Sequence, residues 1–137
     1  MHKLNFFGFS CLLIIITSLV MGFLLLARKS RNKANTIFGL FCLLVSVWGL
    51  GGYGVSIADN KNSAIFWWKI GHVCANLSPI MYFHFVSSYL KLKVNKVLLL
   101  LYVIVIFYTI SLFFFYETFC GDLKLLFGQF YWIYWPK

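Results

Sequence analysis

Residues 6–27 read FFGFSCLLIIITSLVMGFLLLA, a run of apolar side chains that contains no ionisable residue. A helix needs about 20 such residues to cross a hydrocarbon core of about 30 Å. The run is longer than the roughly 7–15 apolar residues of a secretory signal. Arg28-Lys29-Ser30-Arg31 follows it, where a signal would end in a cleavage pattern of small residues. The stretch therefore predicts a retained membrane-spanning helix.

Three more apolar blocks follow along the chain, which is 62% hydrophobic and only 11% charged. A water-soluble domain carries about twice that share of charged residues. We therefore predict an all-α membrane protein with four transmembrane helices in one membrane domain, residues 1–137. Residues 117–137 are expected to form an outer, partly interfacial segment, because the apolar stretch 123–135 is too short to cross. The four helices are expected at residues 5–27, 36–58, 64–90 and 97–116.

Basic residues gather in two short gaps between the apolar blocks. The gaps 28–35 and 91–96 hold seven of the twelve lysines and arginines. Such residues accumulate in cytoplasmic loops, so we predict both gaps inside and both termini outside. The protein is then a multi-pass protein of the inner or plasma membrane. Because the net charge of +9 is placed in these gaps rather than in a stripe with exposed aromatics, nucleic acid is not expected as a partner.

Polar side chains are concentrated in the third predicted helix and, at about 100° per residue, they gather on one face. Polar groups inside a membrane are costly and usually face protein or water. One interpretation is a track that binds a ligand or senses a proton, with two histidines as the titrating groups. The other is a set of hydrogen bonds to neighbouring helices, with the lysine reaching the headgroups. The residues of this face are Lys69, His72, Asn76, His84 and Ser87.

Glycine is frequent in the second half of the second predicted helix, where Gly49 and Gly52 are the candidate packing positions. Small residues let membrane helices approach closely, and glycine also makes a helix more flexible. Both a packing role and a flexible point used in signalling remain open. In the third predicted helix, Pro79 removes one backbone donor and is a candidate for a kink.

Catalytic and metal-binding patterns are missing from the sequence. The three acidic residues, Asp59, Glu117 and Asp122, all fall outside the predicted spans. A proton-coupled transporter normally needs an embedded carboxylate, so this class is disfavoured. Since the sequence has no phosphate-binding loop, HExxH motif or Cys/His ligand spacing, we expect no enzymatic activity, no cofactor and no metal.

Several motifs follow one another in a characteristic order. In the second predicted helix they are Asn32-Lys33-Ala34-Asn35, Phe38-Gly39-Leu40-Phe41, Trp48, Gly51 and Tyr53. In the third they are Ala64-Ile65-Phe66-Trp67, Gly71-His72, Pro79 and Phe83-His84-Phe85-Val86. This order resembles the N-terminal seven-helix sensor region of bacterial histidine kinases. The closing Tyr134-Trp135-Pro136-Lys137 is similar to the outer loop before that family's fifth helix.

This resemblance implies a sensory module of a two-component system that consists of the first four helices of the family's region. Helices five to seven and the kinase motifs are not found in the sequence, so a truncated or shortened form is expected. The expected partners are the lipid bilayer and other transmembrane helices, from a second copy or from the missing sensor and kinase parts; no ligand is indicated. Two alternatives remain: an accessory membrane protein that packs against a partner through its glycine-rich helix, and a small transporter.

Overall fold

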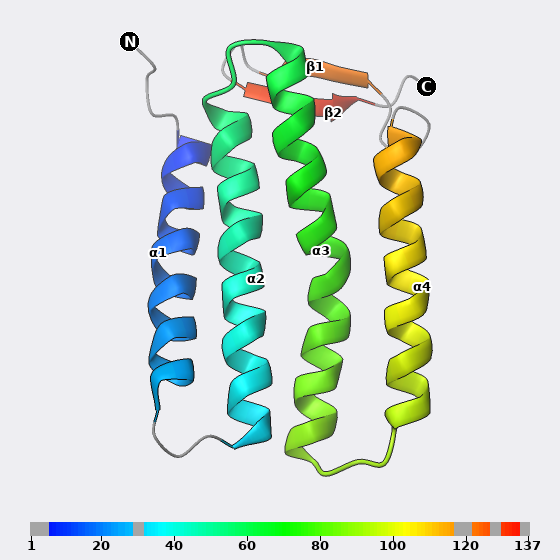
Figure 1. The fold of residues 1–137 in the computed structure, drawn as a ribbon. Helices are drawn as coiled ribbons and strands as arrows, with labels where there is room; N and C mark the ends of the chain where they lie inside the picture. Colours follow the sequence, from blue (N-terminus) through cyan, green and yellow to red (C-terminus); the bar gives the residue numbers. More distant parts are fainter. Residues whose placement is uncertain (1–5, 29–31, 117–121, 127–129, 135–137) are drawn as a thin grey trace.

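The structure is a computed structural model, and it describes residues 6–28, 32–116, 122–126 and 130–134. Within these residues four helices stand side by side, and a two-stranded hairpin lies across one end of them (Figure 1). The predictions for both termini and for Glu117 concern residues outside the described ones. The elements are α1 (Phe6–Ala27), α2 (Lys33–Ser56), α3 (Lys61–Tyr89), α4 (Asn95–Phe114), β1 (Asp122–Leu126) and β2 (Phe130–Tyr134).

Asparagine caps fix where α2 and α3 begin. The side chain of Asn32 accepts a hydrogen bond from the backbone N–H of Ala34 at 3.4 Å. The side chain of Asn60 accepts one from the N–H of Ser63 at 2.8 Å. Such caps satisfy donors that a helix N-terminus leaves unpaired. Both helices therefore begin three residues before the starts expected from hydropathy, at residues 33 and 61 instead of 36 and 64.

Consecutive helices run in opposite directions, with extensive α1–α2 and α2–α3 interfaces and a much smaller α3–α4 interface. Glycines set the close α1–α2 approach. A Cβ added to Gly22 would lie 2.9 Å from Cδ2 of Leu43, and one added to Gly39 would lie 2.9 Å from Cγ of Leu26. The first three helices are thus closely packed side by side, and α4 packs more loosely against α3.

The segment after α4 contains two strands that the sequence analysis does not predict. The outer, partly interfacial location expected for residues 117–137 stays a prediction. Within this segment the structure has an antiparallel pair of strands in which Leu123 is opposite Ile133 and Leu125 is opposite Tyr131. Aromatic and branched side chains in β2 favour a strand, and the hairpin gains stability by packing on the helices. Ile133 packs against Leu112 and Tyr116, which are 2% and 4% exposed.

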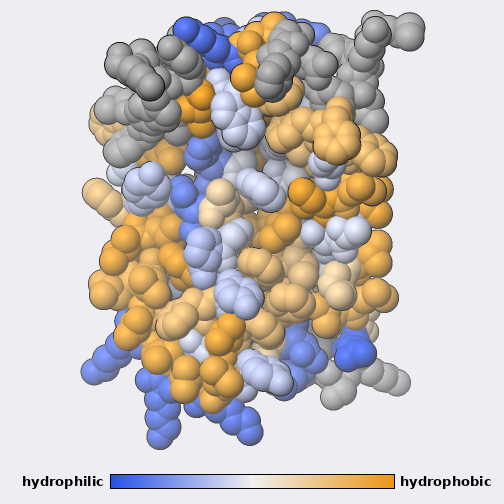
Figure 2. Space-filling view, turned by 180° about the vertical axis from the view of Figure 1, so that it is seen from behind, coloured by the Kyte–Doolittle hydropathy of each residue, from blue (hydrophilic) through white to orange (hydrophobic). Residues whose placement is uncertain are grey.

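On the face that Figure 2 shows, the surface between the two ends of the bundle is mostly hydrophobic. On α1 and α4, large apolar side chains point away from the protein; Phe23 is 62% exposed, Leu99 68% and Phe107 73%. Among the described residues, α1, α2 and α4 are long and apolar enough to cross a membrane. The longest helix, α3, is not among them, because polar residues interrupt it.

Candidate functional site

The polar side chains of α3 meet α4 along a boundary that we call the α3–α4 seam. Figure 2 shows a strip of blue and pale residues that crosses the hydrophobic band beside α4. Contacts across the seam occur near both of its ends, which we call the hairpin end and the loop end. The seam consists of Lys69, His72, Asn76 and His84 of α3 with Tyr102, Thr109, Phe113 and Tyr116 of α4 and the turn after it.

At the hairpin end, the ammonium group of Lys69 lies over two aromatic rings. Its Nζ atom is 5.0 Å from the ring centre of Phe113 and 5.5 Å from that of Tyr116. Nζ also donates a hydrogen bond of 3.4 Å to the backbone oxygen of Phe113. A cation over an aromatic face is attracted by the ring's negative charge density. Among the described residues, the ammonium group is thus held at the seam by two aromatic rings and a carbonyl oxygen.

His72 lies one turn further along α3, and its ring contacts the same Tyr116 ring that lies under the Lys69 ammonium group. The two ring centres are 6.0 Å apart at 83°, an edge-to-face arrangement. The Nδ1 atom of His72 is 2.8 Å from the backbone oxygen of Trp68. Because a carbonyl oxygen only accepts, Nδ1 carries the hydrogen of this bond. Lys69 and His72 therefore meet the same tyrosine.

Between the two ends of the seam, α3 and α4 each carry one buried polar atom that has no hydrogen-bond partner among the described residues. They are Nδ2 of Asn76 and Oγ1 of Thr109. In sequence, Asn76 lies between Lys69 and His84, and Thr109 lies between their contacts Phe113 and Tyr102 on the antiparallel α4. Leaving a buried donor unpaired costs about 1–3 kcal/mol. The two helices thus have unused hydrogen-bonding capacity between the ends of the seam.

At the loop end, His84 and Tyr102 join α3 to α4. Nδ1 of His84 is 3.1 Å from the hydroxyl oxygen of Tyr102, and the rings meet edge to face at 5.9 Å. His84 lies roughly 22 Å along the axis from Lys69, at 1.5 Å per residue. Ser87 is buried, and its hydroxyl donates to the carbonyl of Phe83 in its own helix at 2.8 Å. The predicted polar residues are thus spread along one seam and do not form a single cluster.

Gly49 and Gly52 of α2 lie against α1. A Cβ at Gly49 would be 3.0 Å from Cγ1 of Ile15, and one at Gly52 would be 2.8 Å from the sulfur of Cys11. Neither glycine leaves room for a side chain without a shift in α1. Pro79 lies inside α3, which continues as a helix on both sides of it.

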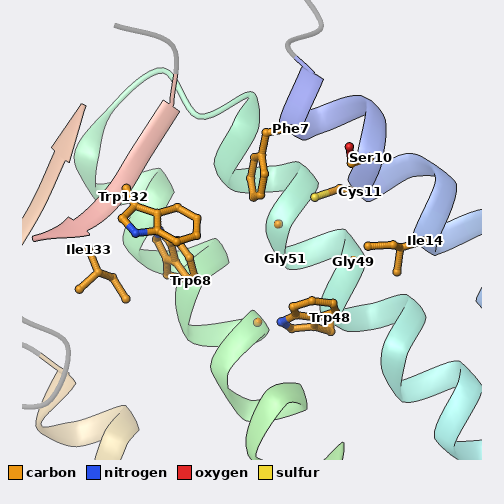
Figure 3. A pocket seen from close by; sticks show the side chains of 12 residues that line it. Phe7, Ser10, Cys11, Ile14, Trp48, Gly49, Gly51, Trp68, Trp132 and Ile133 are labelled. Atoms are coloured by element: carbon orange, nitrogen blue, oxygen red, sulfur yellow. The ribbon is translucent and has the colours of Figure 1, made fainter. Parts of the chain in front are cut away.

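A cavity of about 320 Å³, which the sequence patterns did not indicate, lies near the hairpin end between α1, α2, α3 and β2 (Figure 3). Phe7, Trp48, Trp68 and Trp132 surround it, and glycines of α2 and α3 form part of its wall. The residues that form it are visible in the sequence, since glycines and tryptophans occur in the parts of α2 and α3 near the hairpin end. Only the packed structure shows that the missing side chains leave a space.

Comparison with known families identifies the chain. Residues 10–134 match the family described as the N-terminal 7TM region of histidine kinase. The match covers most of the chain, so the protein belongs to this family, and the resemblance stated from its motifs is confirmed. The family indicates a membrane protein with a sensory role. No curated protein and no solved structure matches the chain.

Proposed function

We propose that this chain is a membrane-embedded sensory module of a two-component system, and that a signal at the hairpin end is transmitted along the α3–α4 seam. The observation that carries the proposal is the seam itself. It is the smallest of the three interfaces between consecutive helices, it contains Lys69 and His84 of α3, and its contacts occur at both ends. A loosely packed interface with alternative polar partners is suited to a small helix shift.

The proposed topology has four crossings, with the hairpin end outside the cell and the loop end in the cytoplasm of an inner or plasma membrane. Three helices have the length and composition for this. For α3, 29 residues are more than enough, and its polar face is turned toward α4 rather than lipid at Lys69 and His84. Arg28, Lys33, Lys91, Lys93 and Lys96 all belong to the loop end, in keeping with the positive-inside rule.

In the proposed mechanism, a signal at the hairpin end changes how Lys69 and His72 meet Tyr116. A shift of α3 against α4 by 1–2 Å, on the scale of helix shifts at switching interfaces, would then alter the His84–Tyr102 contact. The unpaired Asn76 and Thr109 provide hydrogen-bonding groups that a shifted arrangement can satisfy. Such a change transmits information only if the signal binds one arrangement better than the other.

The chain is proposed to have no catalytic activity of its own and to act through other transmembrane segments, either in a second copy or in a kinase partner. The surface of α4 supports this, because apolar side chains cover it in nearly every direction. The glycines of α2 do not support the alternative of an accessory protein that docks through that helix, since Gly49 and Gly52 are covered by α1 of the same chain.

Spin labels at the loop end test the sensory role. In a background without cysteine, labels on exposed Tyr89 and Val97 would report the distance between α3 and α4 in lipid nanodiscs. We expect the distance distribution to change when the outer medium is moved from about pH 8 to about pH 5.5, the range in which imidazole side chains in general change their charge. His72→Gln and His84→Gln identify the responding group.

A matched label pair on α1 and α2, at exposed Leu24 and Leu40, serves as the control for a general expansion of the bundle. The same measurement is repeated with methylnaphthalene in the medium as an uncharged hydrophobic stimulus. If the α3–α4 distance stayed constant under both stimuli, the seam would be a static interface and the proposal would fail. Reporter fusions at residues 29, 60, 93 and 128 test the four crossings independently, since each fusion must report the predicted side.

A further inference from the structure

We propose that the cavity between α1, α2, α3 and β2 is the receptor site of this module, and that its ligand is a free, uncharged hydrophobic molecule of about ten carbon atoms. This inference rests on the proposed sensory function and names the class of signal. The cavity is distinct from the α3–α4 seam, and it is bounded by four elements from different parts of the chain (Figure 3).

The chemistry of the walls sets the polarity of the ligand. None of the residues that line the cavity is charged. The hydroxyl of Ser10 donates to the backbone oxygen of Phe6 at 3.0 Å, and the indole N–H of Trp68 donates to that of Tyr131 at 3.2 Å. These donors are already used within the protein. The other side-chain donors among the lining residues are the indole N–H groups of Trp48 and Trp132 and the thiol of Cys11. A few neutral donors do not replace the hydration of a charged group, so an uncharged ligand is favoured.

The volume sets the size. An engineered cavity of about 150 Å³ in another protein holds benzene, and the present one is about twice that, at about 320 Å³. A bicyclic aromatic compound or a branched alkyl group of about ten carbons fits this space. Ring faces of Phe7, Trp48 and Trp132 border the cavity, and flat aromatic ligands gain from offset or edge-to-face contacts with such rings.

Glycine is what keeps the cavity empty of protein atoms. At Gly71 an added Cβ would meet only Cδ1 of Trp48, at 3.9 Å, an ordinary contact distance. A larger side chain at residue 71 would therefore extend into the cavity. Gly71 of α3 and Trp48 of α2 both line the cavity, and they are neighbours across it.

Trp68 links the cavity to the seam. Its ring lines the cavity and meets the ring of Trp132 at 5.1 Å on the hairpin. The same ring lies 5.4 Å from that of His72, which contacts Tyr116. A ligand that displaces Trp68 would thus move a direct neighbour of the seam. The rings of Trp68, His72 and Tyr116 thus connect the cavity to the turn that follows α4.

Photolabelling of the full chain tests the site. The probe is a photoreactive diazirine derivative of naphthalene, and the competitor is methylnaphthalene. In lipid nanodiscs we expect saturable labelling of Phe7, Cys11 and Trp132, which falls by about fivefold or more with excess competitor. Labelling of lipid-facing Leu99 and Phe107 should not respond, because there the probe is only dissolved in lipid.

Variants complete the test. Gly71→Leu fills the cavity from α3 and Ser10→Leu fills it from α1, and each should abolish the competed labelling. Gly71→Ala should retain it. Size in detergent and helix content by circular dichroism establish whether each variant folds. If one of the two filling variants does not fold, the other still tests the site.

Three results would overturn the inference. The first is labelling that does not saturate, and the second is labelling that persists in both filling variants. The third is saturable labelling in detergent that disappears in nanodiscs, which would assign the cavity to a membrane acyl chain. Labelling does not depend on signalling, so these results leave the pH response of the seam, and with it the proposed function, to be judged separately.

Discussion

The backbones of Gly51 in α2 and Gly71 in α3 are in direct contact near the hairpin end. A Cβ added to Gly51 would lie 2.9 Å from both Cα and N of Gly71, and 3.1 Å from the backbone oxygen of Trp67. These neighbours are backbone atoms, which cannot move aside as a flexible side chain can. The α2–α3 spacing is therefore set by the absence of a side chain at Gly51.

The two glycines differ in the room they leave for a side chain: a Cβ at Gly51 meets backbone, whereas a Cβ at Gly71 meets only Cδ1 of Trp48 at 3.9 Å. Two glycine-to-alanine substitutions test this difference. Gly51→Ala should lower the free energy of unfolding by about 1–3 kcal/mol, because the new methyl group forces the helices apart. Gly71→Ala should leave it unchanged or raise it by up to about 1 kcal/mol, since its methyl group has room and alanine favours a helix. Unfolding by SDS titration in mixed micelles measures both. Equal losses in the two variants would show that the contact is not the determinant of helix spacing.

The hydrogen bond between His84 and Tyr102 should contribute measurably to the α3–α4 interface. We expect Tyr102→Phe and His84→Phe each to lower the free energy of unfolding, with a coupling energy of about 0.5–1.5 kcal/mol in a double-mutant cycle. Tyr108→Phe provides the matched control, because Tyr108 is an exposed tyrosine on the same helix. Additive effects of the two substitutions would mean that the side chains do not interact across the seam.

The structure contains four helices, as the sequence predicts, and three of them, α1, α2 and α4, are each decided by a long local run of apolar residues. Their starts were less accurate for α2 and α3, where Asn32 and Asn60 cap the helix before the apolar run begins. The hairpin was missed because residues 123–135 were judged by whether they could span a membrane. Its stability depends instead on contacts such as that of Ile133 with Leu112, which are distant in sequence.

The candidate site was only partly predictable for a related reason. A helical wheel places Lys69 and His72 on one face, but it cannot say which helix they meet. Their partners Phe113 and Tyr116 belong to an apolar, aromatic segment in which nothing distinguishes them locally. The cavity beside Gly71 depends on how three helices and a strand pack together, so no pattern within one segment could indicate it.

The charge of Lys69 should stabilise the hairpin end of the seam through the rings of Phe113 and Tyr116. Lys69→Met keeps the length of the side chain and removes its charge, and we expect a loss of about 0.5–2 kcal/mol in the free energy of unfolding. Lys69→Arg should restore most of it, because guanidinium also lies favourably over aromatic rings. Equal stability of the methionine variant and the wild type would indicate that the lysine simply extends to the headgroups.

Burial of Leu112 should be essential for holding α4 to the hairpin. This side chain is 2% exposed and packs with Tyr116, Ile65, Trp68 and Ile133. Leu112→Ala leaves a cavity, so the free energy of unfolding should fall by about 2–5 kcal/mol. Phe114→Ala is the control, because Phe114 is 78% exposed and should cost far less. A similar loss in both variants would contradict the assignment of Leu112 to a packed core.

The indole N–H of Trp68 ties the hairpin to α3 by donating to the backbone oxygen of Tyr131 at 3.2 Å. Trp68→Phe keeps an aromatic ring but removes this donor, a loss of about 0.5–1.5 kcal/mol. If the hairpin opens locally, this corresponds to amide exchange about 2–13 times faster in β1 and β2, with little change in α1 and α2. Hydrogen–deuterium exchange in nanodiscs measures this difference, and Trp48→Phe in α2 is the matched control. Exchange that accelerates equally in all elements would show that Trp68 stabilises the whole bundle rather than the attachment of the hairpin.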